Sequence, residues 1–458
     1  MTDTEHFNIH DYLVPGKRAH LVGIGGVSMR PLGLVLQMKG MTITGSDMNS
    51  SVSTQELEHN GIRVSIGHSA ENIRGADCII RTAAVHNDNP EIAAARALGI
   101  PVFERAEAWG VIMQRYKHAI CIAGTHGKTT TSSMVTHIFL QAEKNPTVMI
   151  GGNLPILGAG HRVGQGDYII MESCEYCNSF LNFFPTTALI LNIEEDHLDF
   201  FKDLADIQAS FRRFAELVPN GGTVVANGED ENTMKALDGL DVVTFGMQPG
   251  YRVYGTNFSE DYRSFDLYAG DQFFCHLNLR VYGRHNAQNA IAAAAVAWCY
   301  GIDAEAIQDG LASFGGAGRR MEYKGSYHGA DVYDDYAHHP GELHALFTAA
   351  RMMGYKRIIA AFQPHTYTRT AALFDDFVRE LQLPDVTILA EIYAARERNT
   401  IGISSRDLCT QIPGSSYCST LPQVTQQLRD LAQPGDLILT VGAGDIYRVG
   451  DSLCRKED

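Results

Sequence analysis

The sequence has no apolar run long enough to span a membrane. A transmembrane helix needs about 20 consecutive apolar residues, and the opening segment "MTDTEHFNIHDYLVPGKRAH" lacks the apolar core of a secretory signal. Positive charge is scarce too, because 37 Lys and Arg stand against 53 Asp and Glu, for a net charge of −16. Nucleic-acid binders usually carry a basic stripe. We therefore predict a cytoplasmic protein with no membrane span and no nucleic-acid partner.

Cysteine is sparse and irregularly spaced. The nine cysteines are scattered over 458 residues and odd in number, which argues against a disulfide framework. Cys174 and Cys177 form one C-x-x-C, but no second pair at zinc-binding spacing accompanies it. We interpret that pair as a coincidence.

The sequence does contain a repeated alternation of short apolar runs and helical segments. It begins with "AHLVGIGG", restarts at "KHAICIAG" and restarts again near residue 323. Alternation of this kind favours parallel, doubly wound sheets. Residues 251–282 instead alternate aromatic and polar residues, which favours an antiparallel part. We predict an α/β protein of three domains: a Rossmann-like domain over 1–117, a central domain with a mixed sheet over 118–322, and a second Rossmann-like domain over 323–458.

A short glycine–lysine loop follows the apolar run "HAICIA". In "GTHGKTTTSS", two residues separate Gly124 from Gly127, whereas the standard phosphate loop has four between its glycines. The glycines let backbone N–H groups turn inward, and the start of the next helix favours anions at the same place. Lys128 can reach a phosphate oxygen, and the hydroxyl of Thr129 or Thr130 can hold Mg²⁺. The segment predicts a variant nucleotide-triphosphate loop.

Acidic residues follow two later strands of the same segment. "DYIIMES" delivers Glu172 at a strand end, and "NIEEDHLDFF" delivers carboxylates around His197. Either group alone could be an ordinary surface acid or an acidic helix start. Because the carboxyl ends of parallel strands share one edge, we expect both beside the glycine–lysine loop. We interpret Glu172 and His197 as ligands of Mg²⁺.

A second glycine loop lies near the N-terminus. "GIGGVS" matches G-x-G-x-x-G with Ser28 in place of the third glycine, and Asp47 follows near the spacing of a ribose-binding acid. A tight turn would explain the glycines equally well. With two such loops on separate domains, one could hold the energy source and the other a substrate that itself carries a nucleotide.

Further motifs appear in order along almost the whole chain. They are "GIGGVSM", "GTHGKTTT", "ALILNIEEDHLDFF", "GRHNAQNAIAA", "GAGRRME", "DDYAHHP" and "FQPHTYTRT". Together they resemble the Mur ligases of peptidoglycan synthesis, which builds the cell wall, and most closely the alanine-adding branch of that family. The last two motifs are the most discriminating within the family.

The resemblance implies an amide-forming ligase that uses ATP and Mg²⁺. The lactyl carboxylate of UDP-N-acetylmuramate would attack the γ-phosphate, and the amine of L-alanine would then displace phosphate from the acyl phosphate. These small molecules would be its partners, and the chain would be a monomer or a weak homodimer.

The resemblance also implies a role for each matching residue. The catalytic group would be Lys128, Glu172, His197, Arg320 and His338. ATP would be bound by Gly124, Thr125, His126, Gly127, Lys128, Thr129, Thr130, His285, Asn286, Asn289, Arg320 and Asp335. The nucleotide sugar would be held by Gly25, Gly26, Ser28, Asp47, His68 and Thr82. The amino-acid side would include Tyr336, His338, His339, His365 and Arg369, and Arg369 would pair with the free carboxylate, as suits a planar guanidinium. The metal ligands would be Thr129, Thr130, Glu172 and His197.

Two positions depart from common family patterns. Several sister ligases carry a metal-supporting lysine where this chain has Phe211, and the alanine-adding branch lacks that lysine as well. Thr366 stands where many relatives have arginine, so that Arg369 would carry more of the contact with the amino acid.

Three other readings stay open. A sister ligase that adds a tripeptide or glutamate would share most of the motifs. An oxidoreductase that binds NAD through "GIGGVS" would leave "GTHGKTTT" unexplained. A regulator that binds nucleotides without catalysis would have no need of Lys128, Glu172 and His197 together.

Overall fold

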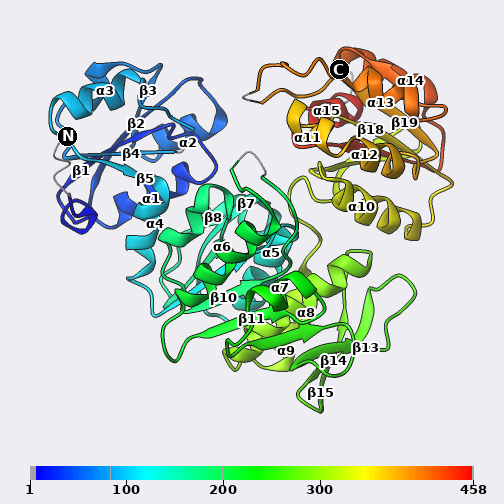
Figure 1. The fold of residues 1–458 in the computed structure, drawn as a ribbon, viewed down its shortest axis with the longest axis horizontal. Coiled ribbons are helices and arrows are strands. Elements are labelled where there is room, and N and C mark those ends of the chain that lie inside the picture. The colour runs from blue at the N-terminus through cyan, green and yellow to red at the C-terminus, as the bar shows by residue number, and fades with distance from the viewer. Residues whose placement is uncertain (1–6, 83, 198–199, 396, 456–458) are drawn as a thin grey trace. The chain divides into compact units, whose positions relative to one another are not determined.

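The computed structural model describes residues 7–82, 84–197, 200–395 and 397–455. The chain divides into two compact units, Met1–Tyr254 with Ala292–Gly310, and Gly255–Ile291 with Leu311–Asp458. The division passes through β13 (Val253–Thr256) and through helix α8 (Arg284–Cys299). Three β-sheets organise the chain (Figure 1), and this three-domain α/β architecture confirms the predicted fold class. The predicted boundaries at residues 117 and 322 stay predictions.

The N-terminal sheet is wholly parallel, with the order β3-β2-β1-β4-β5. Because the strands run parallel, the loops after β1, β2 and β4 leave the sheet at the same edge. The strands are β1 (Arg18–Val22), β2 (Thr42–Asp47), β3 (Arg63–Ile66), β4 (Cys78–Arg81) and β5 (Val102–Glu104). The helices are α1 (Met29–Met38), α2 (Val52–His59), α3 (Pro90–Ala97) and α4 (Arg105–Met113), with short 3-10 turns η1 (Ile9–Asp11) and η2 (Ala70–Ile73).

The first unit holds a second sheet, in which β13-β12-β11-β10-β6-β9-β7-β8 are neighbours. It is mixed, as predicted, because β8 runs antiparallel to β7 and the other pairs run parallel. The strands are β6 (His118–Ala123), β7 (Thr147–Leu154), β8 (Ala159–Arg162), β9 (Tyr168–Glu172), β10 (Thr187–Ile190), β11 (Thr223–Asn227) and β12 (Val243–Gly246). The accompanying helices are α5 (Lys128–Gln141), α6 (Leu204–Glu216), α7 (Glu231–Ala236) and the 3-10 segments η3 (Pro155–Leu157) and η4 (Tyr176–Asn182).

Phe211 belongs to the core of this unit. It is fully buried on α6, and its ring meets Phe180 edge to face at 5.3 Å. Phe180 also stacks on Phe214, with ring centroids 4.4 Å apart. This aromatic cluster fills the position at which we expect several sister ligases to carry a metal-supporting lysine.

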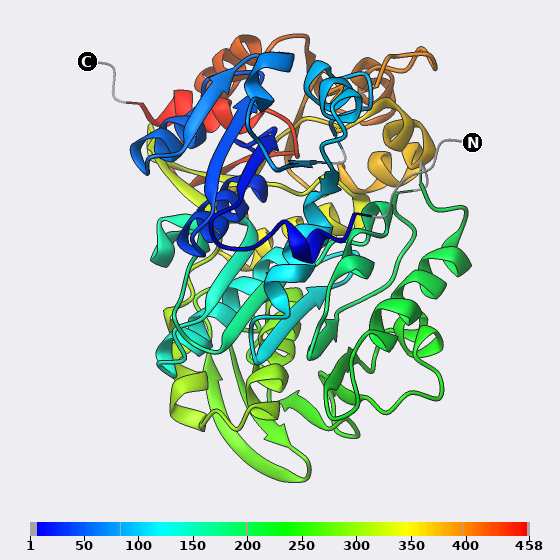
Figure 2. The ribbon, with the colours of Figure 1, turned by 90° about the vertical axis from the view of Figure 1, so that its left-hand side faces the viewer.

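The antiparallel expectation for residues 251–282 is partly confirmed. Strands β14 (Ser264–Ala269) and β15 (Gln272–Asn278) form an antiparallel hairpin, visible in Figures 1 and 2. For β13 the expectation is wrong, because this strand pairs in parallel with β12. The physical reason is that residues 247–252 return the chain to the level of Phe245 before β13 begins, so both strands run the same way.

The third sheet lies in the second unit and has the order β16-β17-β21-β18-β19-β20. Only β16 and β17 pair in an antiparallel sense among these described strands. The strands are β16 (Glu322–Tyr327), β17 (Ala330–Asp335), β18 (Arg357–Phe362), β19 (Val386–Ala390), β20 (Ser416–Cys418) and β21 (Asp436–Val441). The helices are α10 (Pro340–Met352), α11 (Tyr367–Ala372), α12 (Phe374–Glu380), α13 (Ser405–Gln411), α14 (Leu421–Leu431) and α15 (Tyr447–Cys454), and α9 (Ala304–Ser313) precedes the sheet in the chain.

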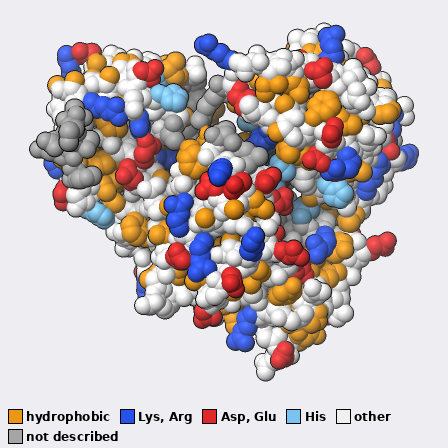
Figure 3. All heavy atoms as spheres, in the orientation of Figure 1, with side chains coloured by type: hydrophobic (Ala, Val, Ile, Leu, Met, Phe, Trp, Pro, Cys, Tyr) orange, Lys and Arg blue, Asp and Glu red, His pale blue; other side chains and the backbone are white. Residues whose placement is uncertain are grey.

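Surface charge agrees with the composition. On the face drawn in Figure 3, the described acidic and basic side chains are interspersed, without a continuous basic stripe. Among the described residues, no helix combines the length and apolarity that crossing a bilayer requires.

A buried carboxylate holds the open edge of the N-terminal sheet together. Glu91 on α3 is fully buried and accepts hydrogen bonds from Ser46 Oγ at 2.6 Å and Asn72 Nδ2 at 2.5 Å. His68 Nδ1 lies 3.3 Å from Glu91 Oε2, and His20 Nε2 lies 3.7 Å from the same oxygen. Burial alone would raise the pKa of Glu91, but these partners outweigh it and lower the pKa to about 2.

We expect Glu91 to contribute acid-sensitive stability. The pKa of this carboxyl is lowered from 4.5 to about 2 on folding, so its contribution is complete above pH 4.5 and is lost as the pH falls towards 2. It amounts to about 3 kcal/mol. The E91Q variant should melt at a lower temperature than the wild type at pH 6 and should lose less stability between pH 5 and pH 3, where the wild-type carboxylate loses its contribution. Thermal melts followed by the fluorescence of the two tryptophans, Trp109 and Trp298, measure both.

The matched control is E58Q, since Glu58 is exposed on α2. E58Q should melt like the wild type throughout this range. Equal pH slopes for E91Q and the wild type would contradict the role given to Glu91.

Candidate functional site

The glycine–lysine loop follows β6 and opens α5. Gly124 has φ 149° and Gly127 has φ 83°, which is left-handed backbone that favours glycine. A Cβ on Gly124 would also lie 2.9 Å from Leu191 Cβ. Helix α5 begins at Lys128, so its free N–H groups open onto the loop, where an anion is favoured. Thr129 is buried and Thr130 half-buried on the first turn of the helix.

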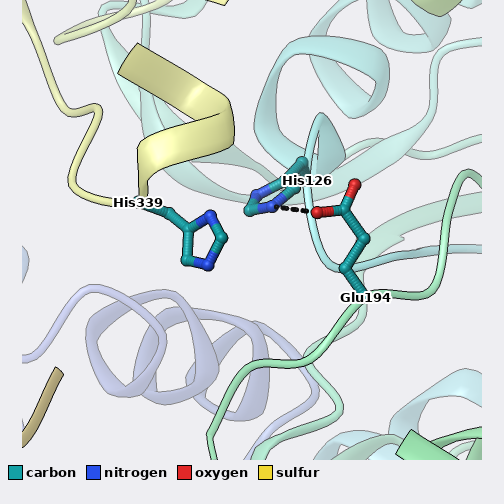
Figure 4. Close-up of side chains that lie close together, drawn as sticks. All are labelled: His126, Glu194 and His339. Carbon is teal, nitrogen blue, oxygen red and sulfur yellow. Dashed lines mark ion pairs between the residues drawn. The ribbon is translucent and has the colours of Figure 1, made fainter. Parts of the chain in front are cut away.

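The segment after β10 holds this loop in place. Asn192 Oδ1 accepts a hydrogen bond from His126 N at 2.8 Å, and Asn192 O accepts one from Thr125 N at 3.0 Å. Glu194 N donates to Thr125 Oγ1 at 2.9 Å. His126 Nε2 and Glu194 Oε2 form an ion pair at 3.5 Å (Figure 4). The loop's shape is thus determined by contacts with the neighbouring strand as well as by its glycines.

Lys128 is engaged by the loop and by a carboxylate. Its Nζ donates to the carbonyls of Gly124 and Thr125, and to both oxygens of Glu175 at 3.2 and 3.1 Å. Burial alone would lower the pKa of Lys128, but the nearly buried Glu175 carboxylate outweighs it and raises the pKa. The lysine therefore stays a cation at the place where phosphate oxygens would bind.

Glu172 and His197 lie at the same sheet edge as the loop. In the sheet β10-β6-β9, Ile122 of β6 pairs with Glu172 of β9, and Ala123 pairs with Ile190 of β10. Glu172 Oε2 accepts a hydrogen bond from Gly151 N at 2.7 Å. This juxtaposition was expected from the sequence and is confirmed.

His197 is linked to Lys128 through Glu175. Its Nε2 lies 3.8 Å from Glu175 Oε1, and its ring lies 4.7 Å from the Tyr176 ring. His197 has a left-handed backbone with φ 54°, uncommon for a residue with a side chain. Sequence reasoning missed Glu175 as the partner of Lys128 and His197. Its position three residues after Glu172 in the loop beyond β9 was the available signal.

The N-terminal glycine loop is tied to Asp47 at the end of β2. Gly25 N donates to Asp47 Oδ2 at 2.9 Å, and a Cβ on Gly25 would lie 2.9 Å from that oxygen. Ser28 Oγ accepts a hydrogen bond from Trp109 Nε1 at 3.1 Å, and Thr82 Oγ1 accepts one from Ala84 N at 3.1 Å. His68 contacts Ser46 and the buried Glu91 described above. Gly26 is exposed at the tip of the loop.

A cavity of the first unit lies between the N-terminal glycine loop and the end of β9, and the described residues that line it include none of the glycine–lysine loop. It has a volume of about 250 Å³ and is lined from the N-terminal sheet by the loop residues Gly26 and Ser28, with Thr82. Gly151 and Glu172 line it from the central sheet. A ligand held by the N-terminal glycine loop can therefore extend to the predicted metal ligand. Asp47 and His68 are not among its lining residues within the described chain.

The second unit brings a series of predicted residues together. Arg320 lies over the Tyr336 ring at 5.1 Å, and that ring meets the His338 ring at 5.4 Å. The rings of His338 and His365 are 5.9 Å apart, and Arg369 Nη1 lies 3.5 Å from His365 Nδ1. Polar and cationic side chains from the ends of β17 and β18 thus form one continuous row.

Asp335 is a buried acid at the start of this row. It accepts hydrogen bonds from Met321 N at 2.7 Å and Ala337 N at 2.8 Å. Burial raises the pKa of Asp335 to about 6, although Arg320 and the two N–H groups act in the opposite direction. Its charge therefore changes near neutral pH.

The remaining predicted residues also lie in the second unit. His285 and Asn286 open α8, where burial lowers the pKa of His285 to about 4 and Asn286 Nδ2 donates to Tyr282 O at 2.8 Å. Asn289 is half-buried one turn later on the same helix. His339 is the N-cap of α10. Thr366 has φ 68° before α11, so a left-handed backbone stands where many relatives have arginine.

Arg319 was missed by sequence reasoning. Its Nε donates to the buried Asp334 at 2.8 Å, and its other nitrogens donate to the carbonyls of Gly442 and Gly444. Arg319 therefore has a structural role beside Arg320. The sequence "GAGRRME" does not indicate which of its two arginines has the structural role.

The comparisons with known proteins agree with this arrangement. Residues 18–117 match the model described as "Mur ligase family, catalytic domain". Residues 122–297 match "Mur ligase middle domain", and residues 319–444 match "Mur ligase, glutamate ligase domain".

Relatives match over nearly the whole chain. A UDP-N-acetylmuramate–L-alanine ligase of Caldanaerobacter subterraneus subsp. tengcongensis is 44% identical over 446 residues, which are 95% of this chain and 97% of that protein. One of Acetivibrio thermocellus is 43% identical, covering 96% of each chain.

Solved structures match as well. The UDP-N-acetylmuramate-alanine ligase of Thermotoga maritima superposes with a TM-score of 0.81 at 28% identity, over 95% of this chain and 98% of that one. A murein peptide ligase of Psychrobacter arcticus shares the fold, with a TM-score of 0.72 at 23% identity, over 96% of this chain and 98% of that one. With its three segments matched in order and relatives above 40% identity along almost its full length, the chain belongs to the Mur ligase family.

Proposed function

We propose that the chain joins L-alanine to the lactyl carboxylate of UDP-N-acetylmuramate with consumption of ATP, a step in peptidoglycan precursor synthesis. The names of the relatives at 43–44% identity support this reaction. The observation that carries it is the cavity that connects the N-terminal glycine loop with Glu172, beside the glycine–lysine loop. A nucleotide sugar bound in this cavity would bring its acid close to the triphosphate. We propose that the reaction takes place in the cytoplasm, which the nine free cysteines support.

On the ATP side, the chain supplies a preorganised anion site. Lys128 and the N–H groups at the start of α5 would bind the phosphates. Glu175 keeps the lysine charged and aimed into the loop before ATP arrives. We assign the adenine contacts to His285, Asn286 and Asn289, and a γ-phosphate contact to Arg320.

The donor set at the sheet edge suits Mg²⁺. A carboxylate and a threonine hydroxyl are oxygen ligands, which a hard cation that keeps several waters prefers, whereas an imidazole is a less usual ligand for such an ion. Glu172 and Thr129 or Thr130 would hold one ion, and His197 would hold a second. The bound ions would neutralise charge on the transferred phosphoryl group. Gly151 N fixes one oxygen of Glu172, so the carboxylate is oriented before a ligand binds.

On the amino-acid side, the row of the second unit supplies the contacts. Arg369 would pair with the carboxylate of L-alanine. His365 lies against Arg369 and is stacked on Tyr393, with ring centroids 5.7 Å apart, which restricts its orientation. Tyr336 and His338 continue the row from His365 to Arg320, and Asp335 would hold the backbone after β17 in place. Fixing the amine beside the acyl phosphate lowers the entropic barrier to amide formation.

The direct test is ADP release with UDP-N-acetylmuramate and a panel of amino acids and peptides. L-alanine should support turnover, whereas D-glutamate and the tripeptide L-Ala-γ-D-Glu-meso-diaminopimelate should not. Release with the tripeptide but not with alanine would overturn the proposal in favour of the murein peptide ligase activity. Binding of NAD without binding of UDP-N-acetylmuramate would overturn it in favour of an oxidoreductase.

The K128A variant tests the glycine–lysine loop. Removing the cation should lower kcat by roughly 10²–10³-fold, because it stabilises charge on the transferred phosphoryl group. Affinity for UDP-N-acetylmuramate, measured by calorimetry, should stay within about twofold. The control is K235A, a substitution on α7. Equal turnover in K128A and K235A would exclude Lys128 from the reaction.

The E175Q variant tests the ion pair that holds Lys128 before ATP binds. Loss of the carboxylate leaves a largely buried ammonium without its partner, which costs about 3 kcal/mol in the ligand-free protein. A bound triphosphate restores negative charge, so a nonhydrolysable ATP analogue with Mg²⁺ should raise the melting temperature of E175Q more than that of the wild type. The control is E216Q, which breaks a surface pair on α6. Equal shifts in all three proteins would rule out this role.

A further inference from the structure

Arg105 is a cation of the first unit that the sequence motifs leave without a role. It is the first residue of α4 and lines the cavity of about 250 Å³ described above. Of the thirteen described residues that line this cavity, two have an acidic or basic side chain, Arg105 from the N-terminal sheet's side and Glu172 from the central sheet's side. The rest of the lining is apolar or uncharged.

The guanidinium of Arg105 has no hydrogen bond or ion pair with any residue that the structure describes. The adjacent acid, Glu104, is already engaged, because Arg81 Nε donates to it at 2.8 Å. Arg105 is half-buried, and burial lowers its pKa, although an arginine remains charged. A partly dehydrated cation without a neighbouring anion destabilises the protein unless a bound ligand supplies the negative charge.

The neighbours of Arg105 in the cavity indicate which anion it binds. The glycine loop lines the cavity with Gly26, Val27 and Ser28 directly before α1, and the start of a helix favours an anion such as a diphosphate. Cys174, two residues beyond Glu172, lines the cavity together with Arg105 and lies close enough to act on the pKa of Arg105. Arg105 thus lies where the cavity approaches the predicted metal ligand, beyond the diphosphate end of the substrate.

We propose that Arg105 binds the carboxylate of the sugar substrate, the group that attacks ATP. This inference rests on the proposed function, because it takes an acid-bearing nucleotide sugar as the substrate. A guanidinium matches the planar geometry of a carboxylate. In such a two-point pair each carboxylate oxygen keeps a further lone pair, so one oxygen can still attack phosphorus. It would also discriminate against nucleotide sugars that lack the acid.

The test compares two ligands that differ in the lactyl acid. Calorimetry measures binding of UDP-N-acetylmuramate and UDP-N-acetylglucosamine to the wild type and to R105M, with Mg²⁺ and a nonhydrolysable ATP analogue present. In the wild type the acid-bearing sugar should bind more tightly. R105M should bind UDP-N-acetylmuramate roughly tenfold to a hundredfold more weakly than the wild type, the effect of losing a charged hydrogen bond. It should bind UDP-N-acetylglucosamine as the wild type does. Steady-state kinetics should show the same loss in the KM for UDP-N-acetylmuramate.

Two further variants keep the result interpretable. R105K retains the charge without the planar fork and should recover part of the preference, which also covers the case in which R105M fails to fold. R96M is the matched control, because Arg96 is exposed on α3 and bonded to Asn87. It should bind both ligands normally.

Other outcomes overturn the inference. Equal loss of both ligands in R105M would mean that Arg105 binds the diphosphate, and unchanged binding of both would mean that it binds neither. If the wild type turned over neither nucleotide sugar yet bound both, the proposed function would fail while the comparison of affinities still decided the role of Arg105.

Discussion

The parallel register of β9, β6 and β10 is the constraint on which the first unit's chemistry depends. Because β6 lies between the other two, the glycine–lysine loop, Glu172 and the segment of Asn192 leave the sheet at one edge. No single residue of the loop creates the site. A one-residue slip would turn Glu172 to the opposite face of the sheet. The apolar strand interiors that fix this register therefore contribute to function, although they touch no ligand.

The buried and half-buried charged side chains of the first unit differ in how far neighbouring groups compensate their charge. Glu91 is completely enclosed by hydrogen-bonding partners, and Lys128 is held by Glu175 and two carbonyls. Arg105, in contrast, has no partner among the described residues. Buried ions are tolerated when neighbours compensate for their lost hydration. The difference separates charges that other groups of the protein already compensate from a charge that awaits a substrate.

Much of this arrangement was predictable from the sequence. The alternation of apolar runs located the parallel sheets, and glycine spacing located both loops, because backbone geometry restricts what can stand there. The parallel pairing of β13 was not predictable, since a strand's direction depends on where the preceding turn returns the chain. Glu175, Glu91 and Arg319 were missed for a related reason. Their partners lie far away in sequence, and nothing in the local pattern distinguishes a buried acid or arginine from a solvated one.

Phe211 has a consequence for how relatives with different chemistry can arise. Its ring packs with Phe180, which is itself stacked on Phe214, and all three side chains are fully buried. Placing an ammonium-bearing side chain there would strand a cation among aromatic rings. Interconversion with sister enzymes that carry lysine at this position thus requires concerted repacking of several rings. Ancestral intermediates would have had lower folding stability before any gain in metal binding could be selected.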